Sequence, residues 1–344
     1  LKAIFGTVDA VWWCFVIAEA VSLILCLILC LAVTLSALAE TPSLALVLAG
    51  SRGDRSFYDS ASEGGVQLEA DFGTVYTVIE CKENAALYET SLYDAADSYD
   101  VIAAIGWQFW DFLLEGGVPD NCPGKLFLFI DNALDEIPEN MMCITYKQNE
   151  GSFLVGYIAA KLSQSGVIGA VGGEDSDVIN DFLIGYRAGA EYANPDIRVS
   201  FKYANTYEDP SVGKQCALSL YNEGCDIVYA VAGKTGEGVF EAAAETGNLA
   251  IGVDGDQKYI NPDVIICSMV KKVGQSIYDV ISDPASRFQG GATWNADMAT
   301  GYIDVAYGEP DMTQQVSDEL KAEVEALKQQ IIAGEIVVPS AFDD

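Results

Sequence analysis

The stretch LALVLAGSRGDRSFYD, residues 44–59, changes from an apolar run into glycine, charge and an aromatic pair. The apolar run is typical of a buried strand, and the residues after Phe57 have the pattern of a helix. Between them, the Arg-Gly-Asp triplet at 52–54 matches an adhesion motif, although such triplets are common by chance. Three interpretations stay open: an adhesion loop, a plain turn between strand and helix, or a loop that presents Phe57 to a ligand.

The same alternation of apolar runs and amphipathic stretches continues along the chain. The strand candidates form a first series at 44–49, 75–80, 101–105 and 126–130, and a second at 167–171, 198–204, 226–231, 249–253 and 264–267. Strands this apolar, separated by helices, form parallel sheets that helices cover on both faces. Two such series predict an α/β protein with two doubly wound lobes.

The order of the two series sets the expected domain boundaries. Lobe 1 is predicted to contain 43–147 plus about 269–295, and lobe 2 is predicted to contain 148–268 plus about 296–344. The chain would then pass from one lobe to the other three times.

The N-terminal segment, residues 1–39, has the pattern of an export signal. No charge occurs from Ala20 to Ala39, and Ala37-Leu38-Ala39 is a small-x-small site that predicts cleavage before Glu40. An uncharged stretch of this length can also span a bilayer, so a retained N-terminal membrane anchor is the alternative. We expect an exported protein, located in the periplasm or at the cell surface.

Composition argues against several classes of function. Lys and Arg number 18 against 51 Asp and Glu, giving a net charge of −33, and such a surface repels the phosphates of nucleic acid. The chain has no histidine, which removes His-based triads and His metal ligands. The nine cysteines show no CxxC spacing, which favours free thiols over a zinc site. We expect no enzymatic activity, no cofactor and no nucleic-acid partner.

Unusual polar and aromatic residues gather where the predicted strands end, which is where ligands bind in a doubly wound sheet. They are Asp54, Phe57-Tyr58, Gly106-Trp107 and Asp111 in the first series, and Gly172-Gly173, Glu174, Asp175, Phe182, AGKTGEG (232–238) and DGDQ (254–257) in the second. Two such rims predict a cleft lined by aromatic rings and carboxylates. The GKT at 233–235 is not a P-loop, because position 228 is Val228 where that motif needs glycine.

Several motifs give the chain a resemblance to a known family. They include GDRSFYD (53–59), IGWQFWDFL (105–113), NEGSFLVGYIAA (149–160), VGGEDSDVINDFLIGYRAG (171–189) and IGVDGDQ (251–257). In order and spacing the chain resembles the basic membrane protein family of solute-binding proteins, which includes purine nucleoside receptors of ABC importers. The resemblance runs from about residue 43 to 340. It implies a type I periplasmic binding protein fold with a three-segment hinge, a purine nucleoside ligand and an ABC permease as partner.

The resemblance also implies roles for single residues. Phe57 and Phe182 would sandwich the purine, Asp111 would accept hydrogen bonds from the base edge, and Asp254 would bind the ribose hydroxyls, with Lys271 and Gly233 nearby. Asp54 is expected to organise its loop through side-chain-to-backbone bonds. The family usually has asparagine where this chain has Tyr58, which leaves the exact ligand open.

Other interpretations of these residues stay open. Phe182 could belong to the core, Asp111 could be a solvated helix residue, and Lys271 could be a surface charge. At the level of function, the alternatives are a receptor for another small polar ligand such as a sugar, and a membrane-tethered ligand sensor. Paired aromatic residues favour a planar base over a sugar. We expect a monomer.

Overall fold

The structure is a computed structural model that describes residues 18–26 and 41–343. Residues 18–26 are helical, and residues 42–344 form a compact unit of their own. Among the described residues, no helix combines the length and the apolar character that crossing a membrane requires. The expected cleavage site at 37–39 lies outside the described residues, as does most of the expected signal or anchor.

Within residues 41–343, the first lobe is built on a six-stranded sheet with the order β11-β5-β4-β3-β1-β2. Every neighbouring pair in it is parallel. Its strands are β1 (Leu44–Leu48), β2 (Tyr76–Glu80), β3 (Val101–Ile105), β4 (Leu126–Ile130), β5 (Met141–Tyr146) and β11 (Ala292–Ala296). All residues of β1 and β3 are buried, as expected for continuous apolar strands that helices cover on both faces.

The second lobe repeats this plan, with the sheet order β12-β10-β9-β8-β6-β7. The edge strand β12 is antiparallel to β10, and the other described pairs are parallel. The strands are β6 (Val167–Gly172), β7 (Arg198–Tyr203), β8 (Ile227–Val231), β9 (Leu249–Asp254), β10 (Ile265–Lys271) and β12 (Ile303–Ala306). The predicted fold class, an α/β protein with two doubly wound sheets, is confirmed.

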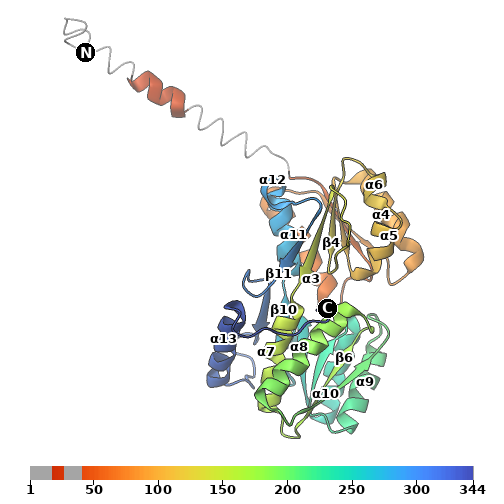
Figure 1. Cartoon of the computed structure of the whole chain (residues 1–344), viewed down its shortest axis with the longest axis vertical. Coiled ribbons are helices and arrows are strands. Elements are labelled where there is room, and N and C mark those ends of the chain that lie inside the picture. Colours follow the sequence, from red (N-terminus) through yellow and green to blue (C-terminus); the bar gives the residue numbers. More distant parts are fainter. Residues whose placement is uncertain (1–17, 27–40, 344) are drawn as a thin grey trace, which may run out of the picture. The chain divides into compact units, whose positions relative to one another are not determined.

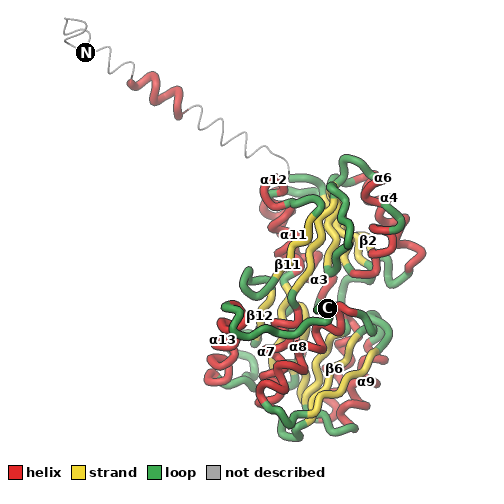
Figure 2. Tube along the Cα trace, viewed as in Figure 1, coloured by secondary structure: helices red, strands yellow, loops and turns green. Residues whose placement is uncertain are grey.

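Helices cover both sheets, as Figures 1 and 2 show. Those of the first lobe are α3 (Phe57–Phe72), α4 (Tyr88–Ser98), α5 (Trp110–Leu114), α6 (Val118–Asn121), α11 (Val273–Ser282) and α12 (Pro284–Arg287). Those of the second lobe are α7 (Gln148–Leu162), α8 (Asp177–Ala193), α9 (Pro210–Asn222), α10 (Glu237–Thr246) and α13 (Asp318–Ile332). Because α11 packs against α3, a late segment of the chain completes the first lobe.

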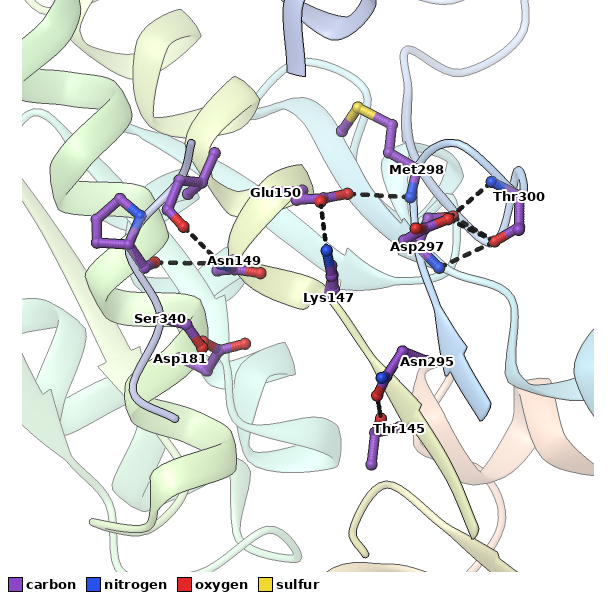
Figure 3. Close-up of polar contacts among 12 residues, drawn as sticks. Thr145, Lys147, Asn149, Glu150, Asp181, Asn295, Asp297, Met298, Thr300 and Ser340 are labelled. Atoms are coloured by element: carbon purple, nitrogen blue, oxygen red, sulfur yellow. Dashed lines mark hydrogen bonds and ion pairs between the residues drawn. The ribbon is translucent and has the colours of Figure 1, made fainter. Parts of the chain in front are cut away.

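The chain passes between the two sheets after β5, after β10 and after β11. At the first crossing, Glu150 accepts a hydrogen bond from the backbone N–H of Met298, at 3.0 Å, and pairs with Lys147 at 3.6 Å. Met298 belongs to the third crossing, so two crossing segments are tied to each other (Figure 3). Thr145 on β5 and Asn295 on β11 also share a hydrogen bond.

The C-terminal segment runs beside the first crossing and is fixed to lobe 2. The Asn149 side chain donates to the carbonyl oxygens of Val338 and Pro339, at 3.2 and 3.1 Å. Asp181 accepts from the hydroxyl of Ser340 at 2.6 Å (both residues are drawn in Figure 3) and from the Ala341 backbone at 3.1 Å. These bonds join the end of the chain to α7 and α8.

In the described part of the chain the cysteines carry free thiols: Cys26, Cys81, Cys122, Cys143, Cys216, Cys225 and Cys267. Several are buried, and burial raises the pKa of Cys143 and of Cys225 to about 11. A thiol with so high a pKa stays protonated at neutral pH and is a poor nucleophile.

Candidate ligand-binding site

A cavity lies between the carboxyl ends of the two sheets, and the space between its atoms, counted together with the open mouth, is about 520 Å³. Both lobes contribute to its lining, which consists of Asp54, Phe57, Tyr58, Gly106, Trp107, Gln108, Asp131, Val178, Ile179, Phe182, Tyr207, Val231, Ala232, Gly233, Val253, Asp254 and Lys271. The structure therefore brings every residue of the predicted binding set except Asp111 to one place.

Asp54 organises the turn between β1 and α3. Its carboxylate is 2% exposed and accepts backbone N–H bonds from Ser56, Tyr58 and Asp59, at 3.1, 2.9 and 3.0 Å. Burial raises the pKa of Asp54 to about 7, although these three bonds favour the charged form. A carboxylate buried in this way is not available to an adhesion receptor, so the triplet at 52–54 is part of a turn.

Aromatic rings from both lobes line the cavity. Phe57 begins α3 of the first lobe, and Phe182 lies on α8 of the second lobe and is 2% exposed. The ammonium of Lys271 lies 5.0 Å from the ring centre of each, and 5.1 Å from the ring centre of Tyr146. A cation at this distance is attracted to the face of an aromatic ring.

Besides Asp54, two further buried carboxylates of the cavity lie near the ammonium of Lys271. Asp131, at the end of β4, pairs with Lys271 at 2.5 Å, and Asp254, at the end of β9, accepts from the Ser56 hydroxyl at 2.6 Å. Burial raises the pKa of both carboxyls, and the nearby Lys271 opposes the rise. An excess of acceptors over positive charge suits a ligand with O–H and N–H groups and disfavours a phosphate.

Tyr58 and Gly233 occupy opposite rims of the cavity. Tyr58 is 6% exposed, and its ring meets the Phe57 ring edge-on with centroids 5.3 Å apart. Gly233 follows β8 and has a φ of 51°, a left-handed conformation that glycine adopts without strain. The tyrosine therefore packs as part of the aromatic wall, where it reduces the space available to a ligand.

The structure places Asp111 away from the cavity. Asp111 lies in the first turn of α5, is exposed and does not line the cavity. Asp131, which directly follows β4, is the carboxylate that reaches the cavity from this part of the first lobe.

The prediction missed some residues that line the cavity. Asp131 and Tyr207 come just after the strand candidates at 126–130 and 198–204. They could have been found by looking for polar and aromatic residues at the ends of predicted strands, as was done for the other strands. Gln108 follows the rim pair Gly106-Trp107 directly. The apolar members, such as Val178, look like ordinary helix or strand residues, and no sequence signal separates them from the core.

Comparison with known proteins places the chain in a family. The family model described as ABC transporter substrate-binding protein PnrA-like matches residues 41–341. The chain belongs to this family. Among the curated relatives, Basic membrane protein A of Borreliella burgdorferi is 35% identical over 88% of each chain. Basic membrane protein D of the same species is 36% identical over 70% of this chain and 71% of the relative.

Solved structures agree with this assignment. A solute-binding protein of an ABC transporter system from Aeropyrum pernix K1 is 28% identical, with a TM-score of 0.78 over 87% of this chain and 94% of its own. A second, from Conexibacter woesei, is 22% identical, with a TM-score of 0.70 over 88% and 99%. These neighbours have the type I periplasmic binding protein fold that the resemblance implied.

Membership in the PnrA-like family gives the general function. The protein is the substrate-binding component of an ABC transporter, takes a small-molecule ligand and has a membrane permease as partner. Substrate-binding proteins of ABC transporters are extracytoplasmic, and the family consists of receptors rather than enzymes.

Proposed function

We propose that the ligand is a purine nucleoside. The observation that carries this proposal is the position of Phe57 and Phe182, which come from opposite lobes and line one cavity. A flat heteroaromatic base between two such rings gains about 1–3 kcal/mol per stacked contact. A sugar has no comparable flat aromatic face, so aromatic rings contributed by both lobes favour a base.

The ribose is proposed to bind at one of the buried carboxylates of the cavity, Asp254. One carboxylate can accept from two adjacent hydroxyls, and charge-assisted bonds of this kind are stronger than neutral ones. The Ser56 hydroxyl already donates to Asp254 from the opposite lobe. Lys271 and the backbone of Gly233 lie on the same cavity, and Lys271 balances part of the negative charge.

Calorimetric titration with ribonucleosides, free bases and free sugars tests the proposal. We expect purine ribonucleosides to bind most tightly, and saturating ligand at about 100 times its Kd to stabilise the protein by about 2.7 kcal/mol. Binding of a sugar without binding of any nucleoside would support the sugar-receptor alternative and contradict the proposal.

We further propose that the protein acts as a monomer and that its segment 1–39 directs it out of the cytoplasm. Mass spectrometry of the protein from its native host tests the proposed role of segment 1–39. A mature chain starting at Glu40 indicates cleavage, whereas retention of 1–39 indicates a membrane anchor and fits the tethered-sensor alternative. Size-exclusion chromatography with light scattering tests whether the protein is a monomer.

A further inference from the structure

Three polar atoms on the cavity wall have no hydrogen-bond partner within the described residues. They are Nε1 of Trp107, Oε1 of Gln108 and the hydroxyl of Tyr207, and all three atoms are buried. The Tyr207 hydroxyl lies near the Trp107 indole and the Ser176 hydroxyl, but none of these contacts has the geometry of a hydrogen bond. All three residues also line the cavity. Buried polar groups in native proteins are nearly always paired, so a group of unpaired ones beside a cavity indicates that a ligand supplies the partners.

These atoms come from both lobes. Trp107 and Gln108 directly follow Gly106 at the end of β3, and Tyr207 follows β7. Gly106 has a φ of 119°, and a Cβ built on it would lie 2.5 Å from Oε1 of Gln108. The turn after β3 therefore needs glycine at 106 if the Gln108 side chain is to keep its position.

The sheet order separates these atoms from the proposed ribose site. In the second sheet, Tyr207 follows the edge strand β7, whereas Asp254 ends β9 and Lys271 ends β10. The strands β6 and β8 lie between the two groups. A ligand that reaches Asp254 with its ribose therefore extends its base toward the side of Tyr207, Trp107 and Gln108.

We propose that Trp107, Gln108 and Tyr207 form the subsite that recognises the hydrogen-bonding edge of the base. This inference rests on the proposed nucleoside function. The indole N–H of Trp107 can only donate, Oε1 of Gln108 can only accept, and the Tyr207 hydroxyl can do either. The matching edge carries at least one acceptor and one N–H donor, as in the 6-oxo and 6-amino purines. Unsubstituted purine riboside has ring acceptors and no N–H donor on its base.

Matched variants and ligands test the subsite, with inosine and purine riboside titrated by calorimetry against each protein. Gln108→Met keeps the size of the side chain and removes its acceptor. We expect it to weaken inosine about 5- to 100-fold and to change purine riboside by less than about 3-fold. Trp107→Phe and Tyr207→Phe keep the aromatic rings and should weaken inosine by a similar factor.

Asp111→Asn is the control, because Asp111 is exposed and lies off the cavity, although the resemblance assigned the base edge to it. We expect unchanged binding of both ligands, and circular dichroism checks that each variant is folded. If Trp107→Phe does not fold, the Gln108 and Tyr207 variants still decide the question.

The outcomes separate this inference from the proposed function. Absence of nucleoside binding by the wild-type protein would overturn the proposed function itself. If the wild-type protein binds inosine, equal losses of both ligands in Gln108→Met would mean that the residue only shapes the cavity. Unchanged inosine binding in all three variants, or a loss in Asp111→Asn instead, would also overturn the subsite.

Discussion

Asp254 has a backbone conformation that limits how its role can be tested. Its φ is 64°, in the left-handed region that asparagine and aspartate tolerate better than alanine. Asp254→Asn therefore removes the charge with little backbone strain. We expect this variant to weaken purine ribonucleosides by about 1.5–3 kcal/mol, the worth of a charge-assisted bond.

The matching free base is the control ligand for Asp254→Asn, because it brings no ribose. Its affinity should change little, or improve relative to the nucleoside, in paired calorimetric titrations. Equal losses for the nucleoside and the base would show that Asp254 supports the rim, through its bond to Ser56, and does not bind ribose.

Phe57 and Phe182 are the residues proposed to stack on the base. We expect Phe57→Leu and Phe182→Leu each to weaken nucleosides by about 1–3 kcal/mol, because leucine fills space without stacking on a base. Thermal unfolding of the free variants is the control for damage to the core, since Phe182 is 2% exposed. Unchanged affinity in both variants would mean that Phe57 and Phe182 pack in the structure and do not bind the ligand.

The raised pKa of Asp54 predicts that the free energy of unfolding depends on pH. Its pKa is about 7 in the folded protein against an ordinary value of 3.8, so the folded state binds the proton more tightly than the unfolded state. The contribution of Asp54 to stability is therefore full below about pH 4 and is lost as pH rises through about 7. A shift of about three pKa units corresponds to roughly 4 kcal/mol at most.

Urea unfolding of the wild-type protein and Asp54→Asn between pH 4 and pH 8 measures this contribution. The free energy of unfolding of the wild type should fall more steeply with pH than that of the variant. Other buried carboxyls, Asp131 and Asp254, also have raised pKa values and act in the same direction, so only the difference between the two proteins is assigned to Asp54. Parallel pH profiles would contradict the prediction.

At the scale of elements, α7 and α8 pack at backbone contact through glycines. A Cβ at Gly156 would lie 2.0 Å from the carbonyl oxygen of Tyr186, and one at Gly189 would lie 1.8 Å from that of Phe153. Because α8 carries Phe182, this contact also sets the position of one wall of the cavity. Any side chain at these glycines must push the two helices apart.

We expect Gly189→Ala to lower the free energy of unfolding by about 1–3 kcal/mol or more, because overpacking a tight interface forces the backbone to move. Chemical denaturation measures the loss. Glu191→Ala, an exposed change on the same helix, is the control and should stay within about 0.5 kcal/mol of the wild type. A neutral Gly189→Ala would contradict the close approach of α7 and α8.

Most elements could be predicted from the sequence because their strands are buried on both faces and read as unbroken apolar runs. The strands β5, β11 and β12 were missed. β11 (ATWNA) contains polar residues, lies at the sheet edge and pairs with a strand about 150 residues earlier, so no local pattern reveals it. Asp111 and Asp131 show the same limit at the site, since only the fold decides which acidic residue reaches the cavity.

At the scale of the whole molecule, hydrogen bonds join the two rims around the cavity. Glu208 of the second lobe accepts from the backbone and hydroxyl of Ser51, at 2.8 and 2.7 Å. Glu83 of the first lobe accepts from the backbone of Tyr207 at 2.8 Å and from Thr206 at 3.1 Å. The structure therefore has its lobes closed over the cavity, and closure itself contributes to holding a ligand.

Ser51 and Glu208 allow closure to be tested apart from ligand contact, because neither lines the cavity. Ser51→Ala removes one of the two bonds to Glu208 and should destabilise the closed state by about 1 kcal/mol, the worth of a typical hydrogen bond, whereas Glu208→Ala removes both and should cost about twice as much. Ligand dissociation should be about fivefold faster in Ser51→Ala and faster still in Glu208→Ala, with little change in the association rate, measured by stopped-flow fluorescence. Glu208 also pairs with Lys234 of its own lobe at 3.7 Å, so Ser51→Ala is the cleaner variant.

The double variant should dissociate no faster than the Glu208→Ala protein, because Glu208→Ala already removes both bonds to Ser51. Additive effects on dissociation would mean that the two residues act separately and that this contact does not hold the lobes closed.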